Sequence, residues 1–102
     1  MLDCIFCKII NKELKADIVY EDQDFVVFKD IKPKAETHLL IVPKKHIESL
    51  NALEDIDLAG KMLLLAKKMI KNQNYKIQIN TGKKAGQIID HLHLHLLSGK
   101  MF

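Results

Sequence analysis

The stretch DHLHLHLLSGKMF, Asp90 to Phe102, holds three of the five histidines, His91, His93 and His95, at alternating positions. In an extended strand successive side chains point to opposite faces, so the three imidazoles would share one face and the intervening leucines the other. On a helix the same spacing would turn His93 away from its two neighbours. Imidazoles spaced about 6 to 7 Å apart in a row are typical of groups that act together on one substrate or ion. The pattern therefore predicts a histidine-lined functional site on a strand.

Two chemistries are compatible with these imidazoles. Histidines two residues apart on a strand can hold a catalytic zinc ion that activates water. Alternatively, one imidazole is a nucleophile that attacks phosphorus or a carbonyl carbon, while its neighbours handle protons. The preceding stretch NTGKKAGQ contains Gly82 and Gly86, which allow backbone N–H groups to approach an anion, and the polar residues Asn80 and Gln87. This loop favours a phosphoryl centre, although an ordinary hairpin loop has the same composition.

The elements that must position these residues follow a simple order. A short helix is predicted over CIFCKIINKEL, with Asp3 as its N-cap. A long helix is predicted from Ile56 to Ile70 by the helical spacing of its apolar residues. Strands are predicted at 18–22, 25–30, 38–43, 75–80 and 91–97. This order predicts an α+β fold with a five-stranded, mostly antiparallel sheet.

Composition limits the function classes. The chain has 102 residues, of which 48% are hydrophobic and 28% charged, and this predicts one domain over residues 1–102. The net charge of +3 comes from scattered lysines, and with two tyrosines and no tryptophan the chain offers no support for nucleic-acid binding. No stretch approaches the roughly 20 apolar residues of a membrane span. The N-terminal stretch has an early acidic residue, Asp3, and no basic leader before its apolar run. We therefore expect a cytoplasmic protein without a membrane partner.

Two further features leave alternatives open. Cys4 and Cys7 form a C-x-x-C pair, which in a chain of this kind is more often a metal or redox pair than a structural disulfide. The predicted long helix confines its polar residues to a sector of about 120°, so its apolar surface is wider than one sheet requires. This helix is either deeply buried or packed on a partner subunit as well as on its own sheet.

The stretch HLHLHLL resembles the His-x-His-x-His-x-x signature of the histidine triad (HIT) family, in which x is hydrophobic. CIFCKII, FKDIKP, THLLIVPKKHI and NTG..AGQ are similar to other characteristic stretches of that family, in the same order and over nearly the whole chain. With its C-x-x-C, the chain looks like the bacterial form of the compact Hint branch, the purine nucleoside phosphoramidate hydrolases. The resemblance implies a bacterial source and a reacting centre without a metal cofactor.

The resemblance implies a catalytic role for each histidine of the triad. His93 would attack the α-phosphorus of an adenosine or guanosine monophosphate derivative with an amine, acyl or similar leaving group, giving a nucleotidyl-histidine intermediate. The backbone carbonyl of His91 would orient the ring of His93. His95 and His38 would line the phosphate side of the pocket and assist with charge and protons.

The resemblance also implies how substrate is bound. Asp30 would accept hydrogen bonds from both ribose hydroxyls, because a carboxylate offers two acceptor oxygens. Asn80 and Gln87 would hold the phosphate or the leaving group. Four apolar residues would form the slot for the base, although a packing role is equally consistent with the sequence: Phe6, Ile9, Phe28 and Ile31.

A structural zinc site and a dimer are implied in the same way. Cys4, Cys7, His46 and His91 match a zinc site of bacterial members, and two thiolates with two imidazoles are a normal tetrahedral set. Such a site would tie the N-terminal helix to the strand that carries the nucleophile. Related proteins form homodimers in which the long helix and a strand of each subunit join a ten-stranded sheet.

The loop departs from the branch at one informative position. Ile88 stands where a serine usually follows Gly-Gln, so a hydroxyl donor near the phosphate is missing and only the backbone N–H of Ile88 remains. Loss of one such donor predicts turnover lower by about 10²- to 10³-fold. Two alternatives therefore stay open: a nucleotide-binding regulatory module with weak or lost catalysis, and a dinucleoside polyphosphate hydrolase of the related Fhit branch.

Overall fold

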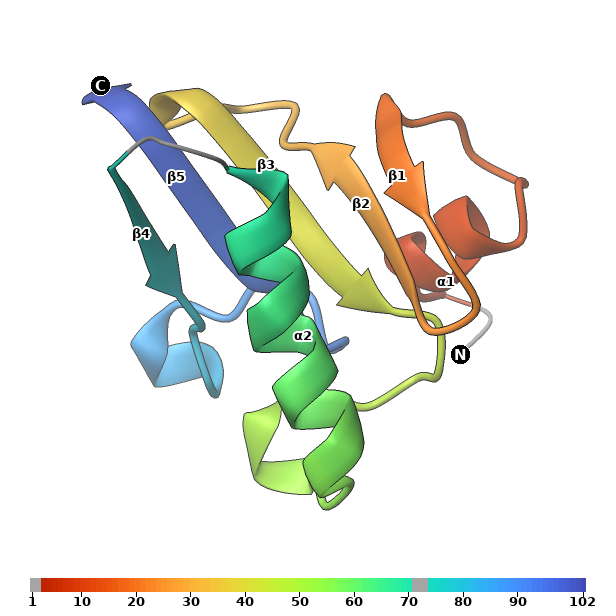
Figure 1. Cartoon of the computed structure of the whole chain (residues 1–102). Coiled ribbons are helices and arrows are strands. Elements are labelled where there is room, and N and C mark those ends of the chain that lie inside the picture. Colours follow the sequence, from red (N-terminus) through yellow and green to blue (C-terminus); the bar gives the residue numbers. More distant parts are fainter. Residues whose placement is uncertain (1–2, 71–73) are drawn as a thin grey trace.

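The computed structural model describes residues 3–70 and 74–102 and consists of a five-stranded sheet with one long and one short helix (Figure 1). The helices are α1 (Ile5–Ile10) and α2 (Ile56–Met69), and short 3-10 turns occur at η1 (Leu50–Ala52) and η2 (Lys83–Ala85). The strands are β1 (Ile18–Glu21), β2 (Phe25–Lys29), β3 (Ala35–Pro43), β4 (Tyr75–Gln78) and β5 (Leu94–Met101). Their order is β1-β2-β3-β5-β4 with every neighbouring pair antiparallel, which confirms the predicted α+β fold.

Several element boundaries differ from the prediction. Helix α1 ends at Ile10 and not at Leu14, and β3 begins at Ala35 and not at His38. The N-cap of α1 is Cys4 and not Asp3, because the Cys4 sulfur accepts the backbone N–H of Cys7 at 3.4 Å. The last strand begins at Leu94 and not at His91. Just before it, the N–H of Leu92 donates to the carbonyl of Ile47 at 2.6 Å, so this part of the chain pairs with a loop instead of a strand.

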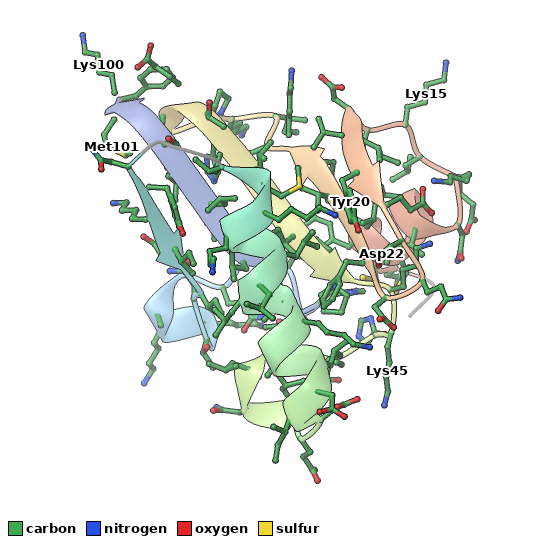
Figure 2. The ribbon with its side chains drawn as sticks, viewed as in Figure 1. Lys15, Tyr20, Asp22, Lys45, Lys100 and Met101 are labelled. Carbon is green, nitrogen blue, oxygen red and sulfur yellow. The ribbon has the colours of Figure 1, made fainter. Side chains whose placement is uncertain are left out.

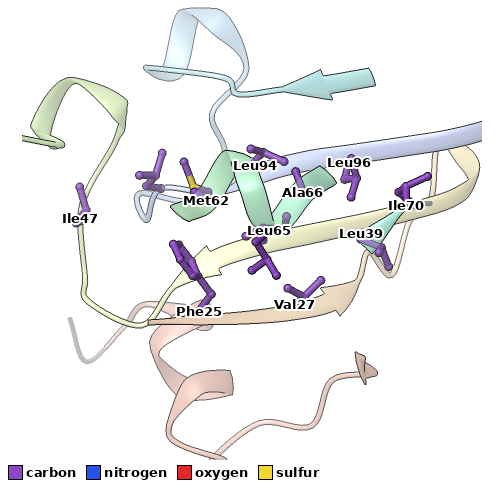
Figure 3. Packing of buried hydrophobic residues seen from close by; sticks show 12 residues of the cluster. Phe25, Val27, Leu39, Ile47, Met62, Leu65, Ala66, Ile70, Leu94 and Leu96 are labelled. Atoms are coloured by element: carbon purple, nitrogen blue, oxygen red, sulfur yellow. The ribbon is translucent and has the colours of Figure 1, made fainter. Parts of the chain in front are cut away.

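Alternation along the strands divides the buried side chains between two clusters, one on each face of the sheet. On β2, Phe25 and Val27 face α2, whereas Val26 and Phe28 face α1. Figure 3 shows the cluster beneath α2, which consists of Phe25, Val27, Leu39, Ile41, Ile47, Met62, Leu65, Ala66, Ile70, Leu92, Leu94 and Leu96. Burial of each large apolar side chain stabilises the fold by about 1.5 to 3 kcal/mol, so both faces contribute.

The two helices cover unequal parts of the sheet. A helix of 6 residues such as α1 is only about 9 Å long, while five strands span about 19 Å. The buried residues of the second cluster accordingly belong to α1, β2 and β3, and they are Phe6, Ile9, Val26, Phe28, Leu40 and Val42. Much of this face over β5 and β4 is therefore left without a covering helix.

The apolar surface of α2 is only partly buried by its own chain. Met62, Leu65 and Ala66 are buried against the sheet, but Leu63 and Leu64 are 53% and 63% exposed. The neighbouring strand β4 is the last in the sheet, and all four of its residues are exposed. Among the described residues, neither helix combines the length and the apolar character needed to cross a membrane.

Candidate active site and metal centre

A cavity of about 790 Å³ lies on the face of the sheet that α1 covers only in part. Its floor crosses three strands, because His95 on β5 pairs with Leu40 on β3 and with Gln78 on β4. His93 and His38 also line it. The alternation inferred from the sequence holds here, since Leu92, Leu94 and Leu96 lie in the cluster on the opposite face.

The ring of His93 is held in one orientation and one tautomer. Its Nδ1 lies 2.8 Å from the backbone carbonyl oxygen of His91. Because a carbonyl oxygen can only accept, Nδ1 carries the proton and Nε2 keeps its lone pair. The rings of Phe6 and His95 contact it at centroid distances of 5.1 and 5.0 Å. The arrangement provides a positioned imidazole nitrogen that can act as a nucleophile or base.

His38 and His95 form a hydrogen-bonded pair whose protons are placed by the backbone. The N–H of Lys34 donates to Nδ1 of His38 at 3.0 Å, so the proton of neutral His38 is on Nε2. That Nε2 lies 2.9 Å from Nδ1 of His95, which must accept, and the proton of neutral His95 is therefore on its own Nε2. His95 thus presents an N–H donor at the nitrogen that the pair leaves free.

Burial keeps both rings neutral. Desolvation lowers the pKa of His38, and the carboxylate of Asp30 opposes this shift. The pKa of His95 falls to about 4, first because the ring is buried and then because His93 and His38 disfavour a further positive charge. At neutral pH these two imidazoles therefore act as hydrogen-bonding groups and not as fixed cations.

Asp30 follows β2 at the edge of the cavity. Its Oδ1 accepts the backbone N–H of Lys32 at 2.8 Å, and its Oδ2 lies 3.4 Å from Nε2 of His38. Asp30, His38 and His95 therefore bring three possible metal-ligand atoms within 4.8 Å of one another. Because the backbone N–H of Lys34 occupies Nδ1 of His38, the proton of His38 is on Nε2, the nitrogen that would have to bind the ion. These residues are therefore better suited to a hydrogen-bonded chain than to a metal.

The loop between β4 and β5 places Asn80, Gly86 and Ile88 along the cavity. Gly86 has a φ of 93°, a left-handed conformation that favours glycine, and an added Cβ would lie 3.3 Å from the side-chain nitrogen of Asn80. The side chain of Ile88 is 91% exposed. No hydrogen bond of the described residues uses its backbone N–H, which remains available to a ligand.

Gln87 lies differently from what the sequence led us to expect. It is buried and is not part of the cavity lining. Its amide oxygen accepts the N–H of Gly82 at 2.9 Å, and its amide nitrogen donates to the carbonyls of Glu48 and Ile89 at 2.7 and 3.1 Å. Both amide protons are therefore used within the protein, and Gln87 supports the loop from behind instead of facing the cavity.

The four apolar residues expected around the base all line the cavity, at the end near α1. The rings of Phe6 and Phe28 meet edge to face at a centroid distance of 5.5 Å, and both also belong to the core. Ile9 is likewise buried, whereas Ile31 is 90% exposed. The first three residues therefore serve packing and cavity shape together, and only Ile31 lies free in the solvent.

A second cluster lies beside the cavity, where Cys4, Cys7, His46 and His91 bring their ligand atoms within 4.8 Å of one another. Nδ1 of His91 lies 3.3 Å from the Cys4 sulfur, and Nδ1 of His46 lies 3.2 Å from the Cys7 sulfur. On its other side, Nε2 of His91 donates to the carbonyl of Pro43 at 2.8 Å. The ring nitrogen that faces the sulfurs is therefore the unprotonated one.

The donor set fits a closed zinc site. Two sulfurs and two imidazole nitrogens are a normal tetrahedral set, and the bond from His91 to a backbone carbonyl is a typical support for a metal-ligating histidine. Burial and the neighbouring Cys4 raise the pKa of the Cys7 thiol to about 11. A bound cation would have the opposite effect, because it stabilises the thiolate.

Several groups that shape the site were not found from the sequence. The N–H of Lys34 and the carbonyl of Pro43 select the tautomers of His38 and His91. No residue type signals such a role, because every residue except proline carries both backbone groups. Lys76, Met101 and Phe102 also line the cavity, and only strand register could have indicated this.

Comparison with known proteins shows similarity over nearly the whole chain. A family profile described as "Scavenger mRNA decapping enzyme C-term binding" matches residues 3–101. Protein HitA of Neisseria gonorrhoeae is 48% identical over 103 residues, which cover 95% of this chain and 96% of that protein.

Two solved structures share the fold. A HIT family hydrolase from Legionella pneumophila superposes with a TM-score of 0.92 at 40% identity, covering 97% of this chain and 95% of that one. A zinc-bound histidine triad family protein from Mycobacterium smegmatis has a TM-score of 0.88 at 28% identity, covering 97% of this chain and 76% of that one. With its sequence and its fold matched over nearly their whole length, the chain belongs to the histidine triad family.

Proposed function

We propose that this chain is a nucleotide hydrolase or nucleotidyl transferase that cleaves a phosphoramidate, acyl or related bond at the α-phosphorus of a purine nucleoside monophosphate. The observation that carries the proposal is the bond from Nδ1 of His93 to the His91 carbonyl, which leaves Nε2 free within a cavity. The similarity to a HIT family hydrolase supports the same class of reaction.

The proposed reaction has two halves. In the first, Nε2 of His93 attacks the α-phosphorus, the bond to the leaving group breaks, and a nucleotidyl-histidine forms while the leaving nitrogen takes up a proton from the solvent. In the second, water attacks phosphorus, the bond to Nε2 breaks, and the attacking water releases one proton to the solvent, which replaces the proton taken up in the first half. The N–H donor of His95 is placed to stabilise charge on the phosphoryl oxygens or the leaving group.

Substrate would lie across the cavity between α1 and β4. The apolar residues Phe6, Ile9, Phe28 and Ile31 would contact the base, and Asp30 would accept hydrogen bonds from the ribose hydroxyls through its remaining lone pairs. Asn80 and the backbone N–H of Ile88 would contact the phosphate. Gln87 would act indirectly, by fixing the loop that carries Ile88.

The isoleucine at position 88 favours slow turnover and is also compatible with a second function. An apolar, exposed side chain lines the cavity where a hydroxyl would donate to the substrate. A nucleotide-binding regulatory module with weak or lost catalysis would keep the same cavity. Measurement of turnover together with binding distinguishes the two functions.

We also propose a structural zinc ion held by Cys4, Cys7, His46 and His91. When bound, zinc supplies a cross-link between α1 and the residues that precede β5, and it takes no part in the reaction. Since Phe6 lies between the two cysteines and touches His93, this cross-link would also maintain the wall of the cavity. The zinc-bound relative from Mycobacterium smegmatis supports this assignment.

A second copy of this chain is the proposed partner of α2 and β4. Ile77 and Tyr75 of β4 pair with Leu96 and Ser98, which places them on the α2 side of the sheet, and they are 39% and 37% exposed. The free edge of β4 can add a strand, so pairing of two such edges would join two five-stranded sheets into one of ten strands.

Replacement of His93 by alanine should abolish catalysis and keep nucleotide binding. We expect hydrolysis of adenosine 5′-phosphoramidate to fall by about 10³-fold or more, because the attacking nitrogen is lost. AMP release and AMP binding should be measured in the same samples, without added divalent cations. Tight binding by both proteins with no release from either would instead establish the regulatory module.

The depressed pKa of His95 predicts a pH-dependent contribution to stability. In the unfolded chain the imidazole takes up a proton below about pH 6.5, whereas in the folded protein it does so only near pH 4. The unfolded state therefore binds more protons as the pH falls from 7 to 5.5, which costs the wild type about 1 kcal/mol of unfolding free energy. Over the same pH interval, the unfolding free energy of His95→Gln, measured by urea titration, should fall by about 1 kcal/mol less than that of the wild type. Equal decreases in both proteins would contradict the assignment.

Removal of one thiol should release the metal. We expect about one zinc ion per chain in the purified wild type by mass spectrometry, and little in Cys7→Ser, whose thermal midpoint should also be lower. His38→Gln is the control, and it should keep its zinc because His38 is outside the cluster. A metal-free wild type whose melting is unaffected by a chelator would rule out the site.

A charge on the free edge of β4 should weaken the dimer. The wild type is expected to sediment as a dimer at micromolar concentration, and Ile77→Asp should shift it toward the monomer, because the carboxylate would be buried in the contact. Val19→Asp is the matched control, since Val19 lies exposed on β1 at the other edge of the sheet. A wild type that is monomeric at every concentration would refute the proposal.

A further inference from the structure

The cavity continues beyond the histidines toward the end of β5. On its floor, His95 is followed two residues later by Leu97, which pairs with His38 on one side and with Lys76 on the other. Met101 and Phe102 line the same end of the cavity. Figure 2 shows Met101 where β5 ends close to β4. This end of the cavity therefore lies beyond the residues assigned above to the base, the ribose and the phosphate.

This region combines an apolar floor with positive charge. Leu97 is buried, whereas Met101 and Phe102 are 43% and 75% exposed, so the apolar surface is open to a ligand. Lys76 supplies one ammonium group. The N–H of Phe102 donates to the carbonyl of Lys34 at 2.9 Å, which holds this end of the chain beside Lys34, a second lysine. A group placed here would contact apolar carbon on one side and ammonium groups on the other.

Within the described part of the chain, the lysines of this region are not paired with acidic side chains. Neither Lys34 nor Lys76 forms an ion pair with any residue in ranges 3–70 and 74–102, although both line the cavity. Asp30 is the acid among the lining residues, and its carboxylate lies next to His38. Glu36 is close in sequence, but it accepts the N–H of Lys100 and is not part of the lining.

The direction of the substrate follows from the proposed function. The apolar wall of α1 lies on one side of His93 and the strand β4 lies on the other, so a nucleotide whose base contacts α1 directs its leaving group toward β4. From His95 to Lys76 the Cα atoms are separated by one strand spacing and two residues, about 8 Å. A lysine side chain covers part of this distance, and a short aliphatic chain on the leaving group covers the rest.

We propose that this region is a leaving-group subsite that selects amines carrying an anionic group, a carboxylate or a phosphate, at the end of a short aliphatic segment. Leu97, Met101 and Phe102 contact the aliphatic segment, and Lys76 determines the preference for negative charge. The proposal rests on the proposed function, because it concerns the group that departs from phosphorus. The chemistry of the bond that breaks is unchanged.

The test compares two adenosine 5′-phosphoramidates that differ only in charge. One carries 4-aminobutanoate on phosphorus, and the other carries 4-aminobutanamide, its neutral isostere. The wild type should show a kcat/KM about two- to five-fold higher for the carboxylate, the size expected for one solvent-accessible ion pair. The ratio should approach one at 1 M salt, because exposed charges are then screened.

Substitution of Lys76 gives a readout that a structural role would not produce. Lys76→Gln should bring the ratio of the two kcat/KM values to about one, and Lys76→Glu should invert it in favour of the amide. Lys15→Gln is the matched control, since Lys15 is exposed on the far side of β1 (Figure 2), is outside the cavity lining, and should keep the wild-type ratio.

The outcomes separate this inference from the proposed function. Equal kcat/KM values for the two substrates in the wild type, with hydrolysis that still requires His93, overturn the subsite and leave the hydrolase. A carboxylate preference that persists in Lys76→Glu overturns the role of Lys76 and with it the subsite. Failure of the wild type to hydrolyse either substrate overturns the subsite, and failure on adenosine 5′-phosphoramidate as well overturns both proposals.

Discussion

One residue, His91, connects the histidines of the cavity with the cysteine cluster, which consists of Cys4, Cys7, His46 and His91. Its carbonyl accepts the proton of His93 at 2.8 Å, while its ring faces the sulfurs of Cys4 and Cys7. A third bond, from the other ring nitrogen to the carbonyl of Pro43, fixes the ring to the end of β3. Because the ring and the carbonyl are joined through the same Cα atom, contacts that hold the ring also restrict the position of the carbonyl. The orientation of the proposed nucleophile therefore depends on the packing of the cysteine cluster.

The cavity exists because the two faces of the sheet are covered unequally. The long helix α2 completes one hydrophobic cluster, while the six-residue helix α1 completes only a smaller one on the other face. Side chains on the uncovered part of that face need not be apolar. His95 and His38 lie there, and His93 lies at its border against Phe6 of α1. The same residues Phe6 and Phe28 close the core and form the cavity wall, so stability and shape are coupled.

Backbone groups determine which ring nitrogen carries the proton, both for the histidines of the cavity and for His91 in the cysteine cluster. The Lys34 N–H, the His91 carbonyl and the Pro43 carbonyl each select one tautomer of a histidine. This explains why similar sets of residues suit different chemistry. The unprotonated nitrogen of His91 faces two sulfurs, which suits a metal, whereas the proton between the rings of His38 and His95 suits hydrogen bonding. Neutral imidazoles at neutral pH follow from burial, so the region owes its positive character to lysines.

Much of the fold could be predicted from local pattern. β-branched runs marked the strands, the helical spacing of apolar residues marked α2, and the alternation from His91 to Leu96 separated imidazoles from leucines, because these patterns report the period of the backbone itself. Boundaries were less accurate where tertiary contacts intervene: Cys4 replaced Asp3 as the N-cap, and Leu92 paired with a loop. The cluster of Cys4, Cys7, His46 and His91 was expected from resemblance to a family, since residues up to 87 positions apart carry no local signal of contact.

The sequence by itself determined the periodicity, the alternation of the histidines and the family to which the chain belongs. Only the tertiary structure decided that Gln87 supports the loop from behind, which tautomer each histidine adopts, and that Lys76 comes to lie beside Leu97. The physical reason is that hydrogen bonds to backbone groups and contacts across strands depend on register and chain path. These are properties of pairs of residues distant along the chain, and residue type alone does not specify them.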